Sequence, residues 1–331
     1  MKTAVVGSGG WGTALALALH RNGHEVVLWS HNTDKAQQVN LCRENPMLPG
    51  IRLPEEIQVT GSDRCVEGCS LVVIASPSVH VRSVCRRIAP FLDKNALMVS
   101  VTKGIEADTF LRMSQIVAEE THRSVVALTG PSHAEEVARQ IPTGCLAACA
   151  DKALAEKVQD AFMSEAFRIY TSPDVIGAEL GGALKNVIAL CAGVIDGLGY
   201  GDNTLAMLMT RGLTEIARLG IPLGAKRDTF AGLAGIGDLI VTCTSRHSRN
   251  RRAGVLLGQG MSPEQVLASS GGAVEGYYAA GSVYALAQKI GVEMPIVEAA
   301  YQVLYQNVSA SDAVAQLLHR QKRPELDSVW Q

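Results

Sequence analysis

The sequence predicts an α/β protein made of two parts, a sheet-containing part over residues 1–172 and an all-α part over residues 173–331. In the first part, short apolar runs alternate with helical patterns, which is typical of a parallel sheet covered by helices on both faces. From Ser172 onward the pattern is almost wholly helical. A chain of 331 residues, 47% of them hydrophobic, is also long enough to form two hydrophobic cores.

A glycine-rich turn between a strand and a helix opens the chain. A short apolar strand leads into GSGGWG at 7–12, and an Ala- and Leu-rich helix follows. In this G-x-G-x-x-G pattern Gly7 makes the tight turn, Gly9 lets a pyrophosphate approach the backbone, and Gly12 lets the helix pack against the strand. The phosphates would meet the N-terminus of the helix. With a second strand at 25–29, the pattern predicts a Rossmann-type dinucleotide-binding domain.

Six more strands are predicted in the first part, each a short apolar run bounded by turn residues. They cover Ile57–Thr60, Leu71–Ala75, Ala96–Val101, Val125–Thr129, Gly144–Ala150 and Arg168–Thr171. Helices are predicted over Val79–Phe91 and Phe110–Glu120.

The second part is predicted to begin with Ser172 as a helix N-cap and Pro173 at the first helical position. Seven helices follow in the prediction. They cover about Val175–Ile195, Thr204–Leu219, Asn250–Leu257, Pro263–Ala268, Gly276–Ile290, Ile296–Tyr305 and Ser311–Leu318.

Charge and composition restrict the partners. With a net charge of -2 and a single basic run, the chain is not expected to bind nucleic acid. The longest uncharged apolar stretch, Thr3–Leu19, is broken by four glycines, so neither a membrane span nor a signal peptide is expected. None of the eight cysteines forms Cys-x-x-Cys or a zinc-ligand spacing. We therefore expect reduced structural cysteines, no metal and a cytoplasmic protein.

Polar residues follow two of the predicted buried strands. Lys103 comes after the strand at 96–101, and Gly130 and Ser132 come after the strand at 125–129. The carboxyl ends of parallel strands border the ligand cleft in proteins of this class, so these residues are candidates for a functional site. A solvated loop lysine and an ordinary turn are the alternative interpretations.

The second part places Lys185 and Asn186 inside a stretch that is otherwise apolar over 180–195. Burial removes water from an ammonium group, which lowers its pKa toward neutrality and makes it a candidate acid or base. Gly181 and Gly182 each cost about 1 kcal/mol in a helix interior, which the close approach of another backbone would explain. The alternative is a lysine at a helix edge that extends to solvent.

Two further polar groups lie along the helical part. Asp238 stands between a pair of glycines and an apolar run, either as a site carboxylate or as a helix N-cap. The segment SRHSRNRR at 245–252 places Ser248, Arg249 and Asn250 at a predicted helix start, a pattern that suits a phosphate ester. A solvated basic face and a nucleic-acid patch have the same composition.

Six sequence blocks together resemble one enzyme family. They are GSGGWGTALA (7–16), TKGIE (102–106), TGPSHAEEVA (129–138), GGALKNVIAL (181–190), GIGDLIVTCTSRHSRNRR (235–252) and VEG (274–276). The combination of LKN, GDLxxTC and SRNRR is similar to that of the bacterial NAD(P)-dependent glycerol-3-phosphate dehydrogenases. The resemblance implies reversible hydride transfer between NAD(P)H and dihydroxyacetone phosphate, giving sn-glycerol 3-phosphate for phospholipid precursor synthesis.

The resemblance also implies a role for each candidate residue. Lys185 matches the proton-transferring lysine of the family, and Asp238 matches its partner at the substrate. The other implied substrate contacts are Lys103, Gly130, Ser132, Asn186, Ser248, Arg249 and Asn250. The implied cofactor contacts, besides the glycines of the turn, are Gly10, Trp11, His31, Lys103, Ala134, Arg249, Ala273 and Glu275. The small-molecule substrate is the expected ligand, and a homodimer is expected.

Two positions depart from the family. Gly10 and His133 stand where the family often has Ser and Phe, respectively. Both positions are expected beside phosphates, where backbone contacts survive a change of side chain.

The residues after the second strand bear on the choice between NAD and NADP. A carboxylate there holds the ribose 2′-OH and repels a 2′-phosphate. In this chain no carboxylate follows the strand at 25–29 before Asp34. We therefore expect NADPH to be accepted and NADH to be used as well, with His31 or Arg249 near the 2′-phosphate.

Two other functions fit parts of the sequence. A β-hydroxy acid dehydrogenase with the same two-domain plan would also have a lysine–asparagine helix, but it would not need the basic segment at 245–252. A non-catalytic dinucleotide-sensing regulator would have no need for Lys185 in an apolar helix.

Overall fold

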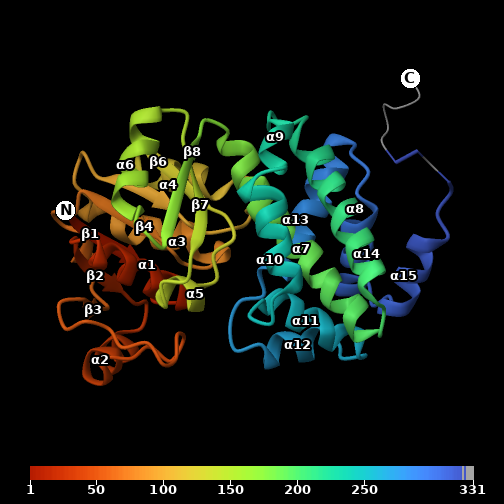
Figure 1. The fold of residues 1–331 in the computed structure, drawn as a ribbon, viewed down its shortest axis with the longest axis horizontal. Coiled ribbons are helices and arrows are strands. Elements are labelled where there is room, and N and C mark those ends of the chain that lie inside the picture. Colours follow the sequence, from red (N-terminus) through yellow and green to blue (C-terminus); the bar gives the residue numbers. More distant parts are fainter. Residues whose placement is uncertain (323, 326–331) are drawn as a thin grey trace.

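The computed structural model describes residues 1–322, 324 and 325, and its first part is built on a mixed eight-stranded sheet (Figure 1). The strand order is β3-β2-β1-β4-β5-β6-β7-β8. The strands are β1 (Lys2–Val6), β2 (Glu25–Trp29), β3 (Gln58–Thr60), β4 (Leu71–Ile74), β5 (Leu97–Ser100), β6 (Val125–Thr129), β7 (Thr143–Ala148) and β8 (Phe167–Ser172). Strands β1 to β6 pair in parallel, so their carboxyl ends lie along the same edge of the sheet.

Strand β7 departs from the all-parallel sheet that the apolar runs suggest. It runs antiparallel to β6, with Ala127 opposite Ala148, and β8 pairs with it in parallel. The connection from β6 to β7 contains only the five-residue helix α5 (Ala134–Ala138), so the chain turns back beside β6 instead of crossing over the sheet. Apolar periodicity does not reveal this direction, because a strand buried on both faces is apolar in either orientation.

Helices cover both faces of the sheet. Besides α5 they are α1 (Gly10–Arg21), α2 (Thr33–Cys42), α3 (Val81–Ile88), α4 (Met113–Thr121) and α6 (Lys152–Phe162). Val73 of β4 belongs to the apolar cluster on one face, and its neighbour Val72 belongs to the cluster on the other. Since successive strand residues point to opposite faces, each central strand contributes to both cores.

Several helix bounds differ from the prediction. Helices α2, α5 and α6 lie outside the predicted elements. Helix α2 buries only Ala36 and Val39, so it has a weak apolar pattern. The helix predicted over 110–120 begins at Met113, because Phe110 has a left-handed backbone with φ of 60°. The helix predicted over 79–91 is α3 flanked by short 3₁₀ turns.

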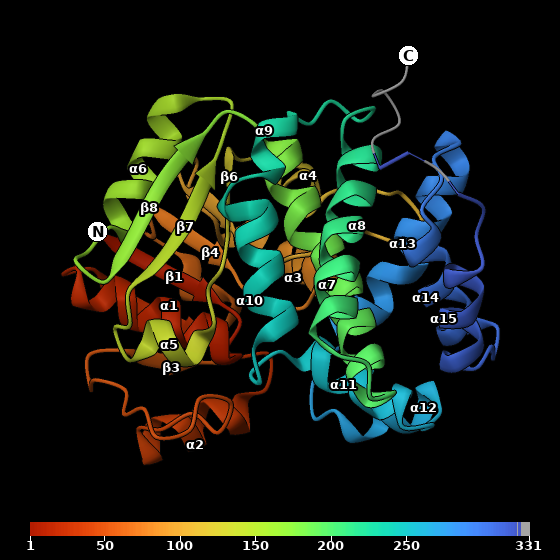
Figure 2. The same ribbon diagram turned by 45° about the vertical axis from the view of Figure 1, so that its right-hand side comes forward.

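Nine helices follow the sheet in the described residues (Figures 1 and 2). They are α7 (Val175–Gly197), α8 (Asp202–Gly220), α9 (Arg227–Phe230), α10 (Asp238–Thr244), α11 (Arg249–Gly258), α12 (Pro263–Ser269), α13 (Glu275–Ile290), α14 (Pro295–Tyr305) and α15 (Ala310–Leu318). A π-helical turn over Leu233–Gly237 precedes α10. The seven helices predicted for this part correspond to α7, α8 and α11 to α15, whereas α9 and α10 were not among them.

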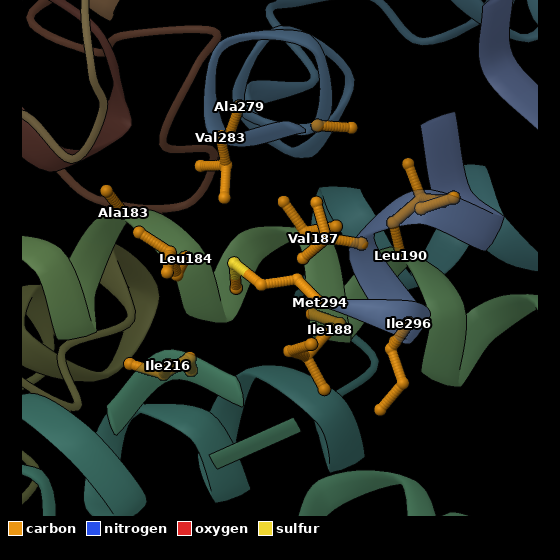
Figure 3. Packing of buried hydrophobic residues seen from close by; sticks show 14 of the residues in the cluster. Ala183, Leu184, Val187, Ile188, Leu190, Ile216, Ala279, Val283, Met294 and Ile296 are labelled. Atoms are coloured by element: carbon orange, nitrogen blue, oxygen red, sulfur yellow. The ribbon is translucent and has the colours of Figure 1, made fainter. Parts of the chain in front are cut away.

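Helix α7 is the centre of the helical part. Figure 3 shows its Leu184 and Ile188 among Ile216 of α8, Val283 of α13 and Met294, which precedes α14. By length and composition α7 could cross a membrane, but 83% of its most apolar stretch is buried inside the protein. Its hydrophobicity is therefore that of a core helix.

Glycines bring α7 and α11 into backbone contact. A Cβ atom on any of four glycines would overlap a carbonyl oxygen of the facing helix; these are Gly193 and Gly197 on α7, and Gly254 and Gly258 on α11. The close crossing holds the start of α11 against the middle of α7, which is the region that carries the candidate site.

The helix start predicted at Ser172 is wrong. Ser172 is the last residue of β8 and pairs with Ala148 of β7. Asp174 is the N-cap instead, and its Oδ1 accepts a hydrogen bond of 2.9 Å from the Gly177 amide. The division of the chain into two domains at residue 172 stays a prediction, and its last residues, 323 and 326–331, lie outside the described residues.

Candidate functional site

The glycine-rich turn has the geometry that a bound pyrophosphate requires. Gly7 has φ of 130°, and a Cβ there would lie 2.6 Å from the carbonyl carbon of Ala75. A Cβ on Gly12 would overlap the Gly7 carbonyl oxygen, so helix α1 packs directly on the turn. A Cβ on Gly9 would meet no protein atom within 4 Å, so the backbone of Gly9, the N-cap of α1, borders open space. Because the amides at the start of a helix attract phosphate, these residues fit a dinucleotide.

The other candidate cofactor residues of the first part lie around this turn. A Cβ on Gly10 would lie 2.7 Å from the Met47 carbonyl oxygen and 3.6 Å from the Ala134 Cβ. A serine at Gly10 would therefore require the segment around Met47 to move. Trp11 is half-buried against the core, and His31 is exposed beyond the end of β2.

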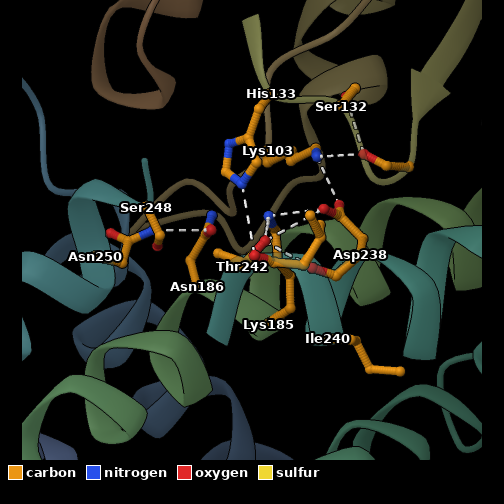
Figure 4. A network of polar contacts seen from close by, with 12 residues as sticks. Lys103, Ser132, His133, Lys185, Asn186, Asp238, Ile240, Thr242, Ser248 and Asn250 are labelled. Carbon is orange, nitrogen blue, oxygen red and sulfur yellow. Dashed lines mark hydrogen bonds and ion pairs between the residues drawn. The ribbon is translucent and has the colours of Figure 1, made fainter. Parts of the chain in front are cut away.

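Lys185 is a buried cation on α7. Its Nζ donates to Oδ1 of Asp238 at 2.9 Å and to Oγ1 of Thr242 at 2.5 Å (Figure 4). Burial lowers the pKa of the Lys185 ammonium to about 8, although the Asp238 carboxylate acts in the opposite direction. The predicted burial and lowered pKa are confirmed, and the solvent-extended alternative is wrong, since Lys185 is only 6% exposed.

Lys103 reaches the same carboxylate from the sheet side. Its Nζ donates to Oδ2 of Asp238 at 2.5 Å and to the Gly130 carbonyl at 3.0 Å. Ser132 donates from Oγ to the same carbonyl at 2.9 Å. Burial alone would raise the pKa of Asp238, but the ammonium groups of Lys103 and Lys185 outweigh it and hold that pKa below its usual value. Two ammonium groups thus share one carboxylate, and the cluster has a net positive charge.

Local structure explains how Asp238 and Thr242 come to face Lys185. Asp238 is the first residue of α10 and Thr242 lies one turn later, so both side chains lie on one face of the helix. The glycines of α7 let the neighbouring elements approach. A Cβ on Gly181 would overlap the Ala234 carbonyl oxygen, and one on Gly182 would lie 2.7 Å from Oγ1 of Thr129 on β6. The predicted backbone approach is confirmed at Gly181, whereas at Gly182 the atoms that approach belong to side chains.

Thr242 was not among the candidate residues. Its hydroxyl donates to the Asp238 main-chain oxygen at 2.6 Å, so its oxygen is left to accept from Lys185. The four-residue spacing from Asp238 on an expected helix was the signal that could have identified it.

A second polar group joins α7, α11 and α13. The Asn250 side chain donates to Oδ1 of Asn186 at 2.9 Å and accepts from the Gly276 amide at 2.9 Å. Ser248 is the N-cap of α11 and accepts from the Arg251 amide at 3.2 Å. Arg249 is the first residue of α11 and is exposed. Since no acidic residue lies in its first turn, this helix start suits an anionic group.

Glu275 connects the helical part to the sheet edge. Its carboxylate accepts from the Ser78 amide at 3.0 Å and from the Ser78 hydroxyl at 2.5 Å. Burial raises the pKa of Glu275. Ala273, two residues earlier, is half-buried. Ser78, which follows β4, is not among the residues predicted from the sequence.

His133 lies beside the cluster. It is the N-cap residue of α5 and its Nε2 lies 3.5 Å from the Val241 carbonyl oxygen. Its ring centroid is 5.9 Å from that of His247, in the segment before α11. Burial lowers the pKa of His133, and Lys185 lowers it further.

The structure therefore assembles the candidates in groups. Five of them form one hydrogen-bonded cluster, namely Lys103, Gly130, Ser132, Lys185 and Asp238. Asn186 and Asn250 form a second group, beside Ser248 (Figure 4). The glycine turn, Trp11 and Ala134 lie together at the start of α1, and His31 lies beyond β2. Such a set can bind a dinucleotide, hold an anionic group and move a proton.

Comparison with known proteins agrees with a site that binds a dinucleotide. The family model for the NAD-dependent glycerol-3-phosphate dehydrogenase N-terminus matches residues 2–155, and the family model for the C-terminus matches residues 174–315. A glycerol-3-phosphate dehydrogenase (NAD(P)+) of Fusobacterium nucleatum is 48% identical over 99% of both chains. One of Moorella thermoacetica is 52% identical over 98% of both chains.

Solved structures show the same relation. The crystal structure of the glycerol-3-phosphate dehydrogenase of Coxiella burnetii superposes with a TM-score of 0.93 at 37% identity, covering 96% of this chain and 99% of that one. The resemblance seen in the sequence blocks is confirmed, and so is a Rossmann-type part followed by a helical part. The chain belongs to the NAD-dependent glycerol-3-phosphate dehydrogenase family.

Proposed function

We propose that this protein catalyses reversible hydride transfer between NAD(P)H and dihydroxyacetone phosphate, giving sn-glycerol 3-phosphate. The observation that carries the chemistry is the buried cluster in which Lys185 and Lys103 share the Asp238 carboxylate. The names of the relatives supply the substrate, and the start of α11 offers a place for its phosphate.

The reduction needs a proton at the carbonyl oxygen as the nicotinamide supplies a hydride to the carbonyl carbon. An ammonium group has three N–H donors. Lys185 uses two on Asp238 and Thr242, which leaves a third for the substrate oxygen. Thr242 can only accept from Lys185, because its own hydrogen goes to the Asp238 main chain. The Lys185 ammonium is thereby aimed, and it gives its proton to the developing alkoxide.

Lys103 stabilises the same oxygen by charge. It also uses two of its N–H donors, on Asp238 and on the Gly130 carbonyl, and its remaining N–H can face the substrate. Two ammonium groups and one carboxylate give the cluster a net positive charge, which favours the negative charge that develops on the oxygen. After proton transfer, the neutral Lys185 amine remains held by Asp238 until water protonates it again. In the reverse direction, the neutral amine removes the proton from the alcohol.

The phosphate of the substrate would lie at the start of α11. Ser248, Arg249 and Asn250 are the residues for this end, and Arg249 is an exposed residue. Asn186 is oriented by Asn250, so the second group connects the phosphate end to Lys185, the residue before Asn186 on α7. A ketose without a phosphate would lose these charged hydrogen bonds.

The cofactor would occupy the glycine turn, with the adenine ribose beyond β2. We infer that NADPH and NADH are both accepted, since β2 is followed by His31 and no carboxylate precedes Asp34. We also infer a role in phospholipid precursor supply, a cytoplasmic location and a homodimer, together with a division into domains at residue 172. Membership of the family and the burial of the apolar helix α7 support these inferences.

The decisive experiment follows NADPH absorbance with dihydroxyacetone phosphate and, separately, with dihydroxyacetone. Rapid turnover of the phosphate ester and little turnover of the free ketone are expected. Preferred oxidation of a β-hydroxy acid in a substrate panel would contradict the proposal in favour of a sister dehydrogenase. Tight NADPH binding without turnover of any phosphorylated ketose would indicate a regulator instead.

A further inference from the structure

We propose that Phe110 is a positioning residue for Lys103, because it fastens the segment that carries Lys103 to the core of the helical part. This inference rests on the proposed function only in treating Lys103 as part of the reacting site. The segment of interest is 105–112, which we call the anchor loop; it follows β5 and Lys103 and ends just before α4.

The anchor loop is packed into the helical part, although it belongs to the sheet part by sequence. Ile105 is 5% exposed and lies in the apolar cluster formed by α7, α8, α13 and α14. Phe110 packs against the same cluster, and the Nζ of Lys289 on α13 lies 5.1 Å from its ring centroid. Two apolar side chains of one short segment therefore hold it on a surface formed by other helices.

Hydrogen bonds within the anchor loop connect its two ends, so that Ile105 and Phe110 are held in one closed segment. The Phe110 amide donates to the Glu106 carbonyl at 3.0 Å, and the Glu106 amide donates to the Leu111 carbonyl at 3.0 Å. Ile105 and Arg112 form an antiparallel bridge. Phe110 has φ of 60°, a left-handed conformation that is unfavourable for an aromatic residue and persists only where packing maintains it.

The far end of the loop is fixed to the helix that carries Lys185. The carboxylate of Glu179 on α7 accepts from the Ser114 amide at 2.8 Å and from the Ser114 hydroxyl at 2.6 Å. The same carboxylate pairs with Arg112. Helix α7 thus carries both Glu179 and Lys185. The anchor loop is therefore attached to the same helix that holds Lys185 against Asp238.

The contacts of the anchor loop affect the position of Lys103, because its side chain has to extend from the sheet part to Asp238. Lys103 lies two residues before Ile105, and its long side chain must meet Asp238 at 2.5 Å across the boundary between sheet and helices. If the loop came away from the helical core, the main chain at Lys103 would move with it. Loss of such alignment can lower turnover strongly, since a displacement of about 1 Å can cost about a hundredfold.

The test compares Phe110→Gly with wild type, Lys103→Met and the double variant in dihydroxyacetone phosphate reduction. Glycine accepts the left-handed backbone, so this change removes the ring without adding strain. Phe110→Gly is expected to lower kcat about tenfold and to leave the Kd for NADPH within about twofold. Added to Lys103→Met, it should change kcat by less than about twofold, because the ammonium that Phe110 positions is already gone. Phe110→Tyr should retain wild-type turnover.

Phe91→Gly is the matched control. Phe91 is also half-buried, and it has the Arg64 guanidinium 4.8 Å over its ring, but it lies on the sheet part away from the cluster. The control should lower the melting temperature and leave kcat within about twofold. If Phe110→Gly does not fold, Phe110→Leu serves in the same double-variant comparison, with a smaller expected loss.

A substrate-free measurement separates this inference from the proposed function. Labelling of Lys103 by an amine-reactive reagent, followed by mass spectrometry, should become faster in Phe110→Gly than in wild type and in Phe91→Gly. Unchanged labelling, wild-type kcat in Phe110→Gly, or independent effects of Phe110→Gly and Lys103→Met would each overturn the positioning role. Lack of wild-type turnover with dihydroxyacetone phosphate would contradict the proposed function alone.

Discussion

The glycine-rich turn and the lysine–aspartate cluster are built in opposite ways. The turn consists of consecutive residues, 7–12, which lead from the end of β1 into the first turn of α1. The cluster joins the end of β5 to α7 and α10, and its Lys103 and Asp238 are 135 residues apart in sequence. Changes in the turn should therefore affect cofactor binding, and changes in the cluster should affect the chemical step.

The largest effect is expected from Lys185→Met. Methionine keeps much of the side chain's shape but removes the proton and the charge, so kcat should fall about 10²- to 10⁴-fold. The Kd for NADPH, measured by fluorescence titration, should change little because the turn is untouched. A wild-type melting curve is the control for folding. Retention of more than about a tenth of the wild-type kcat would refute the role of Lys185 as the acid.

The pH dependence of turnover should follow the same group. The pKa of Lys185 is lowered by burial to about 8, so its ammonium form is lost as pH rises through that value. Reduction needs the ammonium, and its kcat should fall by about tenfold per pH unit above that pKa. Oxidation needs the neutral amine and should increase over the same range. The Lys185→Met variant should lack this limb, and a wild-type-like profile in it would assign the titration to another group.

Arg249→Ala should have an intermediate effect, confined to the phosphate end. Loss of a charged hydrogen bond corresponds to about 1.5–3 kcal/mol, and the lower end is expected because Arg249 is an exposed residue. The KM for dihydroxyacetone phosphate should therefore rise about tenfold, with a smaller rise for NADPH. Steady-state kinetics with each substrate varied in turn would measure both. If both constants stayed within about twofold of wild type, Arg249 would belong to a solvated surface.

The smallest effects are expected from a pair of glycine substitutions. A Cβ at Gly9 meets no protein atom within 4 Å, so Gly9→Ala should keep the wild-type melting temperature. Its methyl group would point toward the phosphates, and the Kd for NADPH should rise about threefold. A Cβ at Gly12 would overlap the Gly7 carbonyl oxygen, so Gly12→Ala should lose about 1–3 kcal/mol of stability. Calorimetry and titration would distinguish the two, and equal melting temperatures would contradict the difference in packing.

Sequence alone was sufficient where the signal is local. The glycine turn and the long helices of the second part follow from residues that are neighbours in the chain, because backbone conformation and helical periodicity are properties of short segments. The burial of Lys185 was predicted for the same reason, since the residues around it on α7 are apolar. The basic segment at 245–252 indicated a phosphate site at Arg249 among other interpretations, whereas the role of Asp238 as the partner of Lys185 was implied only by the resemblance to a family.

Tertiary structure decided the features that depend on partners distant in sequence. The antiparallel direction of β7, the hydrogen bond that Thr242 accepts from Lys185 and the contact of Glu275 with Ser78 are examples. The left-handed Phe110, which starts α4 later than predicted, is another. In each case the residue type permits several conformations or partners, and the choice is made by packing against elements that the local sequence does not contain.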